Sequence, residues 1–556
     1  MNAARCLEHY GAEGMATTGV NLDALIPRED LAVGEGMVSG TQGEEKLGIT
    51  HFQPRSFFST ALRKPEFQRE TVHWTPAKIV DLVTAFLDRR LIPAVILWRA
   101  GQYNFVVDGA HRLSALLAWI YDDYGDGELS KKLFGPYIAP EQLTLANKTR
   151  TLIKDRVGHF SIFQAGVEFP KAVTEEQKSR ISNLSVTHFI AQWVPAATKE
   201  AAEDSFFKIN DAATPLDPTE KRILQSRLSG NAIAARAVAH GGKGYAYWKD
   251  FDSDVQAEVA RLSGQIYTLL YRPPLQSDGP IDTLDVPVGG RGYSVLPFVF
   301  DLINSINAAK VADSTKKTAR DKVEKDATGS ITVTYLKQVL RTVSRITGKE
   351  PASLGLHPVV YFYTKGGAFS PWAFLAWAAM IDDLFERKAV NAFCDVRPLV
   401  EKFLIENKWA MTEIIHKNGS GSRSTPWLKR YWEHALNAFA QGLSYEEVEQ
   451  SALDAFPFLK HKTPVIRLPG EQSAKRISAS TRTAAIWDSQ LPGAPKCDIC
   501  HGVWHRNSIQ GDHVLAKRDG GDGRPSNTGI SHPYCNSTYK DHLAKESGAS
   551  VSAEPS

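Results

Sequence analysis

Residues 92–121 read IPAVILWRAGQYNFVVDGAHRLSALLAWIY and contain two β-rich runs followed by a helical one. β-branched and aromatic residues dominate Ile92–Trp98 and Tyr103–Val107, and a short glycine-containing turn separates the two runs, which predicts a hairpin. The apolar residues of Arg112–Tyr121 then recur with the period of a helix. The stretch therefore predicts a strand–turn–strand–helix unit whose helix follows Asp108-Gly109.

The junction between that second strand and the helix is a candidate anion site. Free N–H groups at the start of a helix attract anions, Gly109 permits close approach of a phosphate, and Arg112 can add donors. A plain turn, or a buried Asp108–Arg112 pair that fixes strand to helix, explains the same residues. The junction alone leaves these alternatives open.

Length and composition describe a globular protein of several domains. The chain has 556 residues, of which 43% are hydrophobic, and this size suggests about three domains. Its 65 Lys and Arg nearly balance 62 Asp and Glu, so the net charge neither requires nor excludes a nucleic-acid partner. The longest apolar run, Trp372–Ile381, is too short to span a bilayer, and no secretory signal precedes it. We expect a cytoplasmic protein without a membrane partner.

The pattern along the chain predicts an α+β multidomain protein. We expect a flexible arm over 1–48, a mixed α/β domain over 49–229, a mainly helical middle over 230–469, a small C-terminal domain over 470–545 and a disordered tail over 546–556. Helical periodicity is clearest in a first segment that starts at Pro76 and in four middle segments, Leu296–Ile306, Tyr335–Ile346, Pro371–Phe385 and Ser424–Gln441. Trp372, Trp377 and Trp427 have helical spacing and are expected in the core.

Three of the five cysteines lie within the last sixty residues. Cys497 and Cys500 form a CxxC pair, and 31 residues later His532 and Cys535 form an HxxC pair. Two close pairs of soft or borderline ligands suit tetrahedral Zn²⁺. Because four protein ligands leave no open position, the predicted zinc is structural.

Between and after these pairs the sequence carries Asp512-His513, Gly520-Gly521, Asn527 and the Asn536 that follows the last cysteine. This order resembles the McrA-like form of the HNH, or ββα-metal, nuclease family. The resemblance implies that His513 is a general base, that Asp512 and Asn536 hold a catalytic Mg²⁺ or Mn²⁺, and that Asn527 orients the loop bearing the histidine.

Two alternatives stay open for this segment. Either His532 or His542 could replace Asn536 as the second ligand of the catalytic cation. In the second alternative, the segment is a zinc knuckle that binds DNA or protein without cutting.

A second resemblance covers about residues 50–225. Phe67-Gln68-Arg69, Trp74, Pro93, the Asp108–Arg112 motif and Phe206–Glu220 are similar to the ParB-like, DGQQR-motif domain of type IV restriction proteins of the GmrS and SspE kind. Ala110 and His111 replace the two glutamines of that motif.

The ParB-like resemblance implies a site that binds and hydrolyses a nucleoside triphosphate, with GTP as a candidate. Arg69 and Arg112 would contact phosphates, Asp108 would act near a metal or water, and Gln68 and Asn210 would line the site beside Gly109 and His111.

Together the two resemblances imply a bacterial phage-defence endonuclease that cuts or nicks phage or modified DNA through the HNH site under nucleotide control. The alternatives are a sensor of DNA modification that does not cut, and a nucleotide hydrolase whose zinc module only binds DNA. Self-association is left open.

Overall fold

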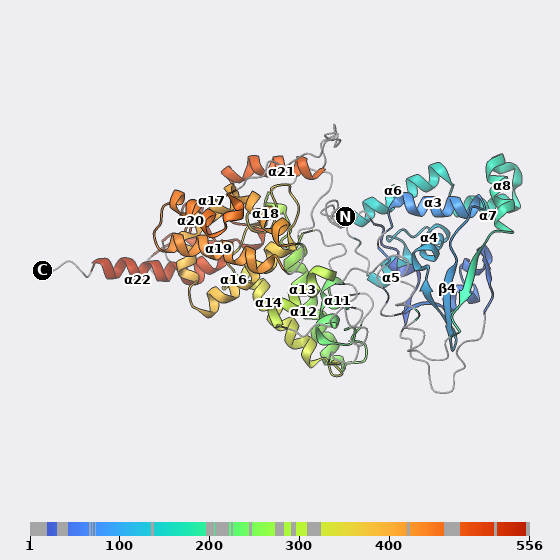
Figure 1. Cartoon of the computed structure of the whole chain (residues 1–556), viewed down its shortest axis with the longest axis horizontal. Coiled ribbons are helices and arrows are strands. Elements are labelled where there is room, and N and C mark those ends of the chain that lie inside the picture. Colours follow the sequence, from blue (N-terminus) through green and yellow to red (C-terminus); the bar gives the residue numbers. More distant parts are fainter. Residues whose placement is uncertain are drawn as a thin grey trace.

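The computed structural model describes residues 19–29, 43–65, 68, 71–72, 74–134, 138, 140–195, 205, 219, 222–223, 226–243, 247–272, 283–290, 296–308, 324–419, 423–460, 479–515 and 520–551. These residues form two bodies with separate hydrophobic cores (Figure 1). One body contains a six-stranded sheet, and the other is mostly helical.

The six-stranded sheet belongs to the N-terminal body and has the order β1-β3-β5-β4-β6-β2. The central β4–β5 hairpin is antiparallel, whereas β3 pairs in parallel with β5 and β6 in parallel with β4. The hairpin confirms the prediction from residues 92–107. The strands are β1 (Arg28–Glu29), β2 (Lys46–Gly48), β3 (Leu62–Pro65), β4 (Val95–Ala100), β5 (Tyr103–Asp108) and β6 (His188–Trp193).

The helices Pro76–Leu87 and Ala110–Tyr121 contribute apolar faces to the N-terminal core. The helix predicted from Pro76 is present, and the Thr75 hydroxyl caps it by accepting from the N–H of Lys78. Trp119 and Phe86 are almost fully buried between helices and sheet. The helices of this body are α2 (Phe57–Ala61), α3 (Pro76–Leu87), α4 (Ala110–Tyr121), α5 (Glu128–Phe134), α6 (Pro140–Arg156), α7 (Phe160–Glu168) and α8 (Glu175–Leu184).

The expectation of a flexible arm over residues 1–48 is wrong for its described part. β1 pairs with β3, and β2 pairs with β6, so both edges of the sheet come from this segment. Val20, Leu22 and Ile26 are fully buried in the N-terminal core. Strands of two and three residues are too short to show a period of two, so the sequence carried no strand signal.

The second body is mainly helical. Each of the four predicted middle segments is a helix, within a few residues at its ends. The body contains α11 (Gly230–Ala239), α12 (Ser253–Tyr271), α13 (Leu296–Asn307), α14 (Ser330–Ile346), α15 (Pro358–Tyr361), α16 (Pro371–Glu386), α17 (Val390–Glu406), α18 (Lys408–Asn418), α19 (Thr425–Ala440), α20 (Tyr445–Ala455) and α21 (Ala479–Gln490). Trp377 is fully buried and stacks on Trp432, as expected of a core residue, whereas Trp427 is 38% exposed.

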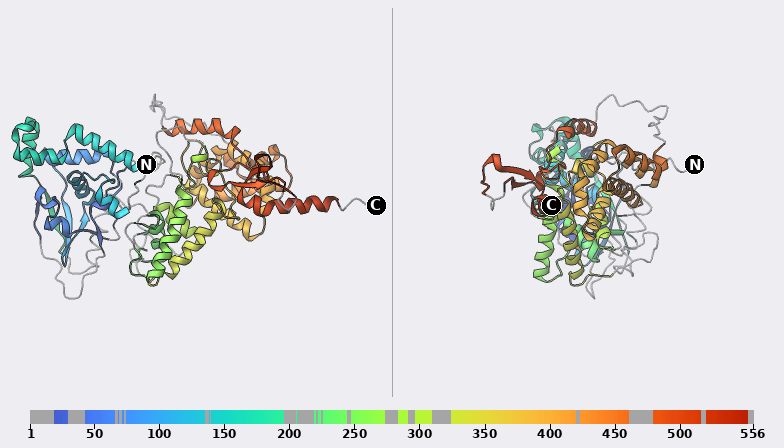
Figure 2. Two further views of the ribbon diagram at one scale, coloured as in Figure 1. Left: turned by 180° about the vertical axis from the view of Figure 1, so that it is seen from behind. Right: turned by 90° about the vertical axis from the view of Figure 1, so that its left-hand side faces the viewer.

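The C-terminal segment is built into this helical body. Trp487, Cys497 and Tyr534 belong to the same hydrophobic core as α16 and α17, so packing does not break at the boundary expected near residue 470. The two-stranded ribbon of β7 (Gln510–His513) and β8 (Thr528–Ser531) extends from the body (Figure 2). Helix α22 (Lys540–Val551) then projects at the end farthest from the sheet. The expected disordered tail is therefore helical as far as Val551.

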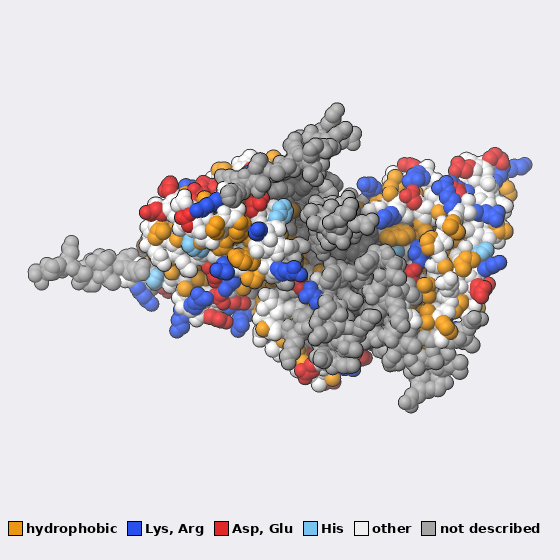
Figure 3. Space-filling view, viewed as in Figure 1, with side chains coloured by type: hydrophobic (Ala, Val, Ile, Leu, Met, Phe, Trp, Pro, Cys, Tyr) orange, Lys and Arg blue, Asp and Glu red, His pale blue; other side chains and the backbone are white. Residues whose placement is uncertain are grey.

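Some described side chains of the two bodies are in contact. Lys249 lies 3.6 Å from the Glu29 carboxylate, and Phe134 stacks on His240 at 6.0 Å. Acidic and basic side chains are interspersed on the face shown in Figure 3, in keeping with the near balance of charge. Among the described helices, none has both the length and the apolar character to cross a membrane.

Candidate functional site

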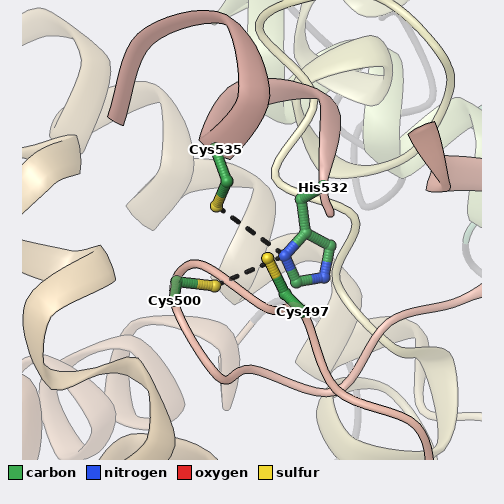
Figure 4. A group of neighbouring side chains, drawn as sticks. All are labelled: Cys497, Cys500, His532 and Cys535. Atoms are coloured by element: carbon green, nitrogen blue, oxygen red, sulfur yellow. Dashed lines mark hydrogen bonds between the residues drawn. The ribbon is translucent and has the colours of Figure 1, made fainter. Parts of the chain in front are cut away.

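Cys497, Cys500, His532 and Cys535 come together as the sequence predicts (Figure 4). Their ligand atoms all lie within 4.8 Å of one another, and each residue is at most 3% exposed. The Nδ1 atom of His532 lies 3.4 Å from Sγ of Cys500 and 3.9 Å from Sγ of Cys535. A tetrahedral zinc with ordinary bond lengths separates N and S ligands by about 3.6 Å. The cluster fits zinc.

The histidine of this cluster has the form that zinc requires. Nδ1 of His532 faces the sulfurs, and the Nε2–H group points to the carbonyl of Val503 at 3.4 Å. Burial lowers the pKa of His532, with the charge of Arg397 as a second cause, so the imidazole is neutral. A neutral ring with one nitrogen donating to a carbonyl and the other facing the metal is the usual arrangement at zinc sites.

A buried ion pair on α17 adjoins the cluster, and Nη1 of Arg397 lies 3.3 Å from Nδ1 of His532. Arg397, with no exposed surface, donates from Nε to Glu401 at 2.8 Å and from its Nη atoms to the carbonyls of Leu354 and Gly355 at 2.6 and 3.2 Å. The other carboxylate oxygen of Glu401 accepts from the Val503 N–H at 2.6 Å. The pair therefore ties α17 to the turn beside the CxxC pair. Sequence reasoning missed both residues.

Residues 510–551 form a strand–strand–helix unit, which is the order expected of a ββα element. β7 and β8 are antiparallel, with Asp512 opposite Gly529 and His513 opposite Thr528. The chain then enters a helix whose first part, Cys535–Tyr539, is π-helical and contains Asn536. π-Helical turns occur often at functional sites.

This unit rests on the segment that follows α14. The Gly348 N–H donates to the Ser508 hydroxyl at 2.8 Å, and the Gln510 amide donates to the Lys349 carbonyl at 3.0 Å. The Ser537 hydroxyl donates to the Pro351 carbonyl at 2.9 Å. The helical body thereby fixes both the strand and the helix of the unit.

Asn527 holds the loop that follows His513. Its Oδ1 accepts from the Leu515 N–H at 2.7 Å, and its Nδ2 donates to the carbonyls of Leu515 and Asp522 at 3.1 and 2.7 Å. Gly521 is required beside it, because a Cβ there would lie 1.7 Å from the Leu515 carbonyl oxygen. These contacts provide a physical basis for the orienting role that the resemblance implies for Asn527.

Asp512 and Asn536 lie on facing elements. The Asp512 side chain is 15% exposed and pairs with Lys540, whose Nζ lies 2.7 Å from Oδ2 and 2.7 Å from the His513 carbonyl. Asn536 donates to the Gln510 side chain at 3.2 Å, and Gln510 is two residues before Asp512 on β7. His513 is partly exposed. His532 belongs to the buried cluster, which removes it from the alternatives for the second cation ligand.

In the N-terminal body, Asp108 ends β5 and Arg112 lies in the first turn of α4. Nη2 of Arg112 lies 2.6 Å from Oδ2 of Asp108 and donates to the Ala94 carbonyl at 3.0 Å. Gly109 caps the helix with a φ of 97°, a conformation that favours glycine. The pair does join strand and helix, yet it is 18–31% exposed and so is accessible to a ligand.

Two further residues of the expected nucleotide site lie nearby. Gln68 is 8% exposed, its Nε2 is 3.5 Å from the Val107 carbonyl, and its Oε1 has no partner among the described residues. His111 stacks against Trp74, with ring centroids 5.8 Å apart. Phe67, Arg69, Asn210 and most of the Phe206–Glu220 segment are outside the described residues.

A buried charge cluster beside Gln68 was not anticipated. Asp23 accepts from Arg28 at 2.9 Å and from Lys64 at 2.6 Å, and all three residues are at most 6% exposed. Arg28 also donates to the Gln68 carbonyl, so the cluster anchors the segment that carries the Gln-Arg motif. The burial of Asp23 and Arg28 could not be predicted, because charged residues in a segment expected to be flexible give no sequence signal of burial.

Comparison with known families supports one of the two resemblances. Residues 54–228 match the model of the N-terminal domain of the GmrSD restriction endonuclease. The GmrSD match spans just under a third of the chain and includes Gln68 and the Asp108–Arg112 motif. It points to a nuclease of the restriction type. Comparisons with curated proteins and with solved structures find no similar protein.

Proposed function

We propose that the protein is a phage-defence endonuclease that cuts or nicks phage or modified DNA at an HNH site, under the control of a nucleotide-binding N-terminal domain. One observation carries the proposal. The ribbon bearing Asp512 and His513, with its loop held by Asn527, adjoins a buried zinc-type cluster in a chain that also carries a GmrSD N-terminal domain.

The residues of the ββα unit suit phosphodiester hydrolysis. The His513 imidazole, on a partly exposed strand, would take the proton of an attacking water. The Asp512 carboxylate and the Asn536 amide offer the oxygen ligands that Mg²⁺ or Mn²⁺ prefers. Such a cation supplies stabilisation of the charge that develops on the phosphate. Lys540, now paired with Asp512, would release the carboxylate or contact a phosphate.

The N-terminal site would respond to a nucleoside triphosphate, with GTP as the first to test. Arg112 and the start of α4 offer donors for phosphates beside Gly109. Phosphate release should persist in Asp512→Ala and disappear in Arg112→Ala. If both variants hydrolyse normally, the nucleotide role is wrong.

The nuclease role is tested with His513→Ala. Loss of a general base should lower plasmid nicking in Mg²⁺ or Mn²⁺ by about 100- to 10,000-fold. The zinc content should be unchanged, because His513 is not a member of the buried cluster. His416→Ala is a matched control, since His416 is an exposed histidine on α18. Unchanged cutting by His513→Ala would refute the assignment.

A DNA-modification sensor that binds without cutting is the second candidate. The 2.7 Å Lys540–Asp512 ion pair favours it, because this contact neutralises the carboxylate that would hold the cation. A sensor would retard modified DNA on a gel in the presence of divalent metal and leave every strand intact.

A further inference from the structure

A cavity of about 470 Å³ opens on the N-terminal body at the end of the sheet away from Asp108. The hairpin end of β4 and β5, the segment from Thr50 to Ala61 and the end of β6 contribute its walls. Asn104 lines the cavity and is four residues before Asp108 on β5, which separates the two by roughly 13 Å. The cavity is therefore distinct from the candidate nucleotide site.

Aromatic rings form one side of the cavity. Phe57 is 95% exposed at the start of α2, although burial of such a ring is normally favourable. Trp193 is held in place, because its Nε1 donates to the Glu44 carbonyl at 3.1 Å and the backbone of Gly43 lies against its ring. Both rings line the same cavity, and an exposed aromatic ring is a stacking surface for a flat ligand.

Polar side chains with unused hydrogen-bonding groups form the other side. Arg99, Gln102 and Asn104 line the cavity from the hairpin, and none of their side chains has a hydrogen-bond or ion-pair partner among the described residues. An amide offers both a donor and an acceptor, which matches the edge of a nucleobase, and an arginine suits a phosphate.

Arginines lie in and near the cavity. Arg99 lines it, Arg55 belongs to the segment from Thr50 to Ala61, and Arg63 lies on β3, which pairs with β5. Arg63 stacks over the Tyr103 ring at 4.4 Å, which fixes its position near Asn104. The acidic lining residue Glu44 lies 2.8 Å from Nε2 of His51. Arg99 together with the nearby Arg55 and Arg63 outnumbers this one carboxylate, which favours a ligand with a phosphate backbone over a neutral one.

We propose that this cavity receives a nucleobase turned out of a DNA duplex. The base stacks on Phe57, its edge bonds to Asn104 and Gln102, and the arginines hold the flanking phosphates. The inference deepens the proposed action on DNA and rests on it. The volume is within the range of about 300–1,000 Å³ for small-ligand sites, so a base carrying an added group can enter. The cavity would thus be where the N-terminal domain inspects DNA for modification.

The test uses the full chain carrying His513→Ala, without divalent metal, so that binding is measured without cutting. The probes are two fluorescein-labelled 20-base-pair duplexes, one fully matched and one with a single central mismatch. Turning a base out is least costly at a mismatch, so the mismatched duplex should bind more tightly by fluorescence anisotropy. A structural role of the cavity would not produce this preference.

Phe57→Ala should weaken binding of the mismatched duplex by about 5- to 100-fold and abolish the preference, because stacking on the ring is lost. Arg99→Ala should weaken both duplexes and preserve the preference. Leu91→Ala and Arg89→Ala are matched controls, since both residues are exposed in the same body but do not line the cavity, and Leu91 is 99% exposed. Both controls should bind like the parent.

Three results would overturn the inference. The first is that Phe57→Ala binds each duplex with the same affinity as the parent does. The second is a free deoxynucleoside monophosphate that competes at the same concentration as the duplex, since the cavity would then take free nucleotides. The third is absence of DNA binding, which refutes the proposed function as well if the unsubstituted chain also fails to cut. If the unsubstituted chain cuts DNA normally but Phe57→Ala does not change DNA binding, only the role of the cavity is refuted.

Discussion

Replacing Arg397 by methionine would remove the cation that joins α17 to the segment that carries the Cys497–Cys535 cluster. Glu401, which is 3% exposed, would then carry an unpaired charge in the core. Breaking a buried ion pair by removing one partner costs about 3–5 kcal/mol. The bonds to the Leu354 and Gly355 carbonyls are lost as well, at about 1 kcal/mol each. We expect Arg397→Met to lower the free energy of unfolding of the helical body by about 5–7 kcal/mol.

The assay is urea denaturation at a fixed free Zn²⁺ concentration, followed by tryptophan fluorescence. The double variant Arg397→Met/Glu401→Gln leaves no unpaired charge, so it should lose only about 2–3 kcal/mol. The double variant should therefore be more stable than Arg397→Met by about 3–4 kcal/mol, because residues of one ion pair do not contribute additively. Zinc affinity of Arg397→Met should fall by about 10- to 100-fold, as for other residues that support metal ligands.

Arg345→Met is the matched control. Arg345 pairs with Asp382 at 2.7 Å in the same body, but the two side chains are about one-fifth exposed and lie outside the segment that carries the cluster. Its loss should cost about 1 kcal/mol or less and leave zinc affinity unchanged. Equal effects of the two arginine variants, or additive single changes at Arg397 and Glu401, would refute the reasoning.

Three other perturbations have defined outcomes. Asn527→Ala removes the bonds that hold the loop after His513, so nicking should fall by about 100-fold with zinc content retained, and full activity would contradict the orienting role. Burial lowers the pKa of Lys408 from 10.5 to about 8. The buried charge therefore destabilises the folded state by its full amount below pH 8, and this destabilisation disappears as the pH rises from 8 to 10.5. Lys408→Met should therefore raise the free energy of unfolding at pH 7 by about 2 kcal/mol, a figure that allows for the lost hydrogen bond to the Val359 carbonyl. It should also remove the rise in stability between pH 8 and 10. A parent protein whose stability is constant over that range would contradict this. Burial alone would raise the pKa of Asp23, but the charges of Arg28 and Lys64 hold it well below its usual range, so its contribution is present above about pH 4 and is lost as the pH falls below that value. Asp23→Asn should cost the N-terminal body about 3 kcal/mol at pH 7, measured by thermal unfolding, and an unchanged midpoint would show that the cluster is not a stabilising unit.

The elements with a strong local pattern could be predicted. The β4–β5 hairpin, α4 and the helices of the middle follow from periodicity and turn residues, since their apolar faces repeat along the chain. The four zinc-type ligands follow from two short spacings, because each pair lies within a single turn of the chain. The order of Asp512, His513 and Asn527 resembles a ββα-metal motif, and these residues lie on β7 and in the turn directly before β8.

The short edge strands and the single helical core could not be predicted. β1 and β2 exist because β3 and β6 offer them free backbone groups, which is a property of the assembled sheet. The expected boundary near residue 470 depended on composition, whereas Trp487 and Tyr534 pack into the core of the middle helices.

The candidate sites divide in the same way. The sequence by itself determined which residues can bind zinc, which can hold a hard cation and which motif can meet a phosphate, because these properties are those of the side chains and their local spacing. Only the tertiary structure decided that Arg397 and Glu401 support the cluster from more than a hundred residues away, that Lys540 pairs with Asp512, and that Phe57 and Arg99 share a cavity. Those contacts arise from packing between elements distant in the chain, where burial and desolvation select partners that no local pattern records.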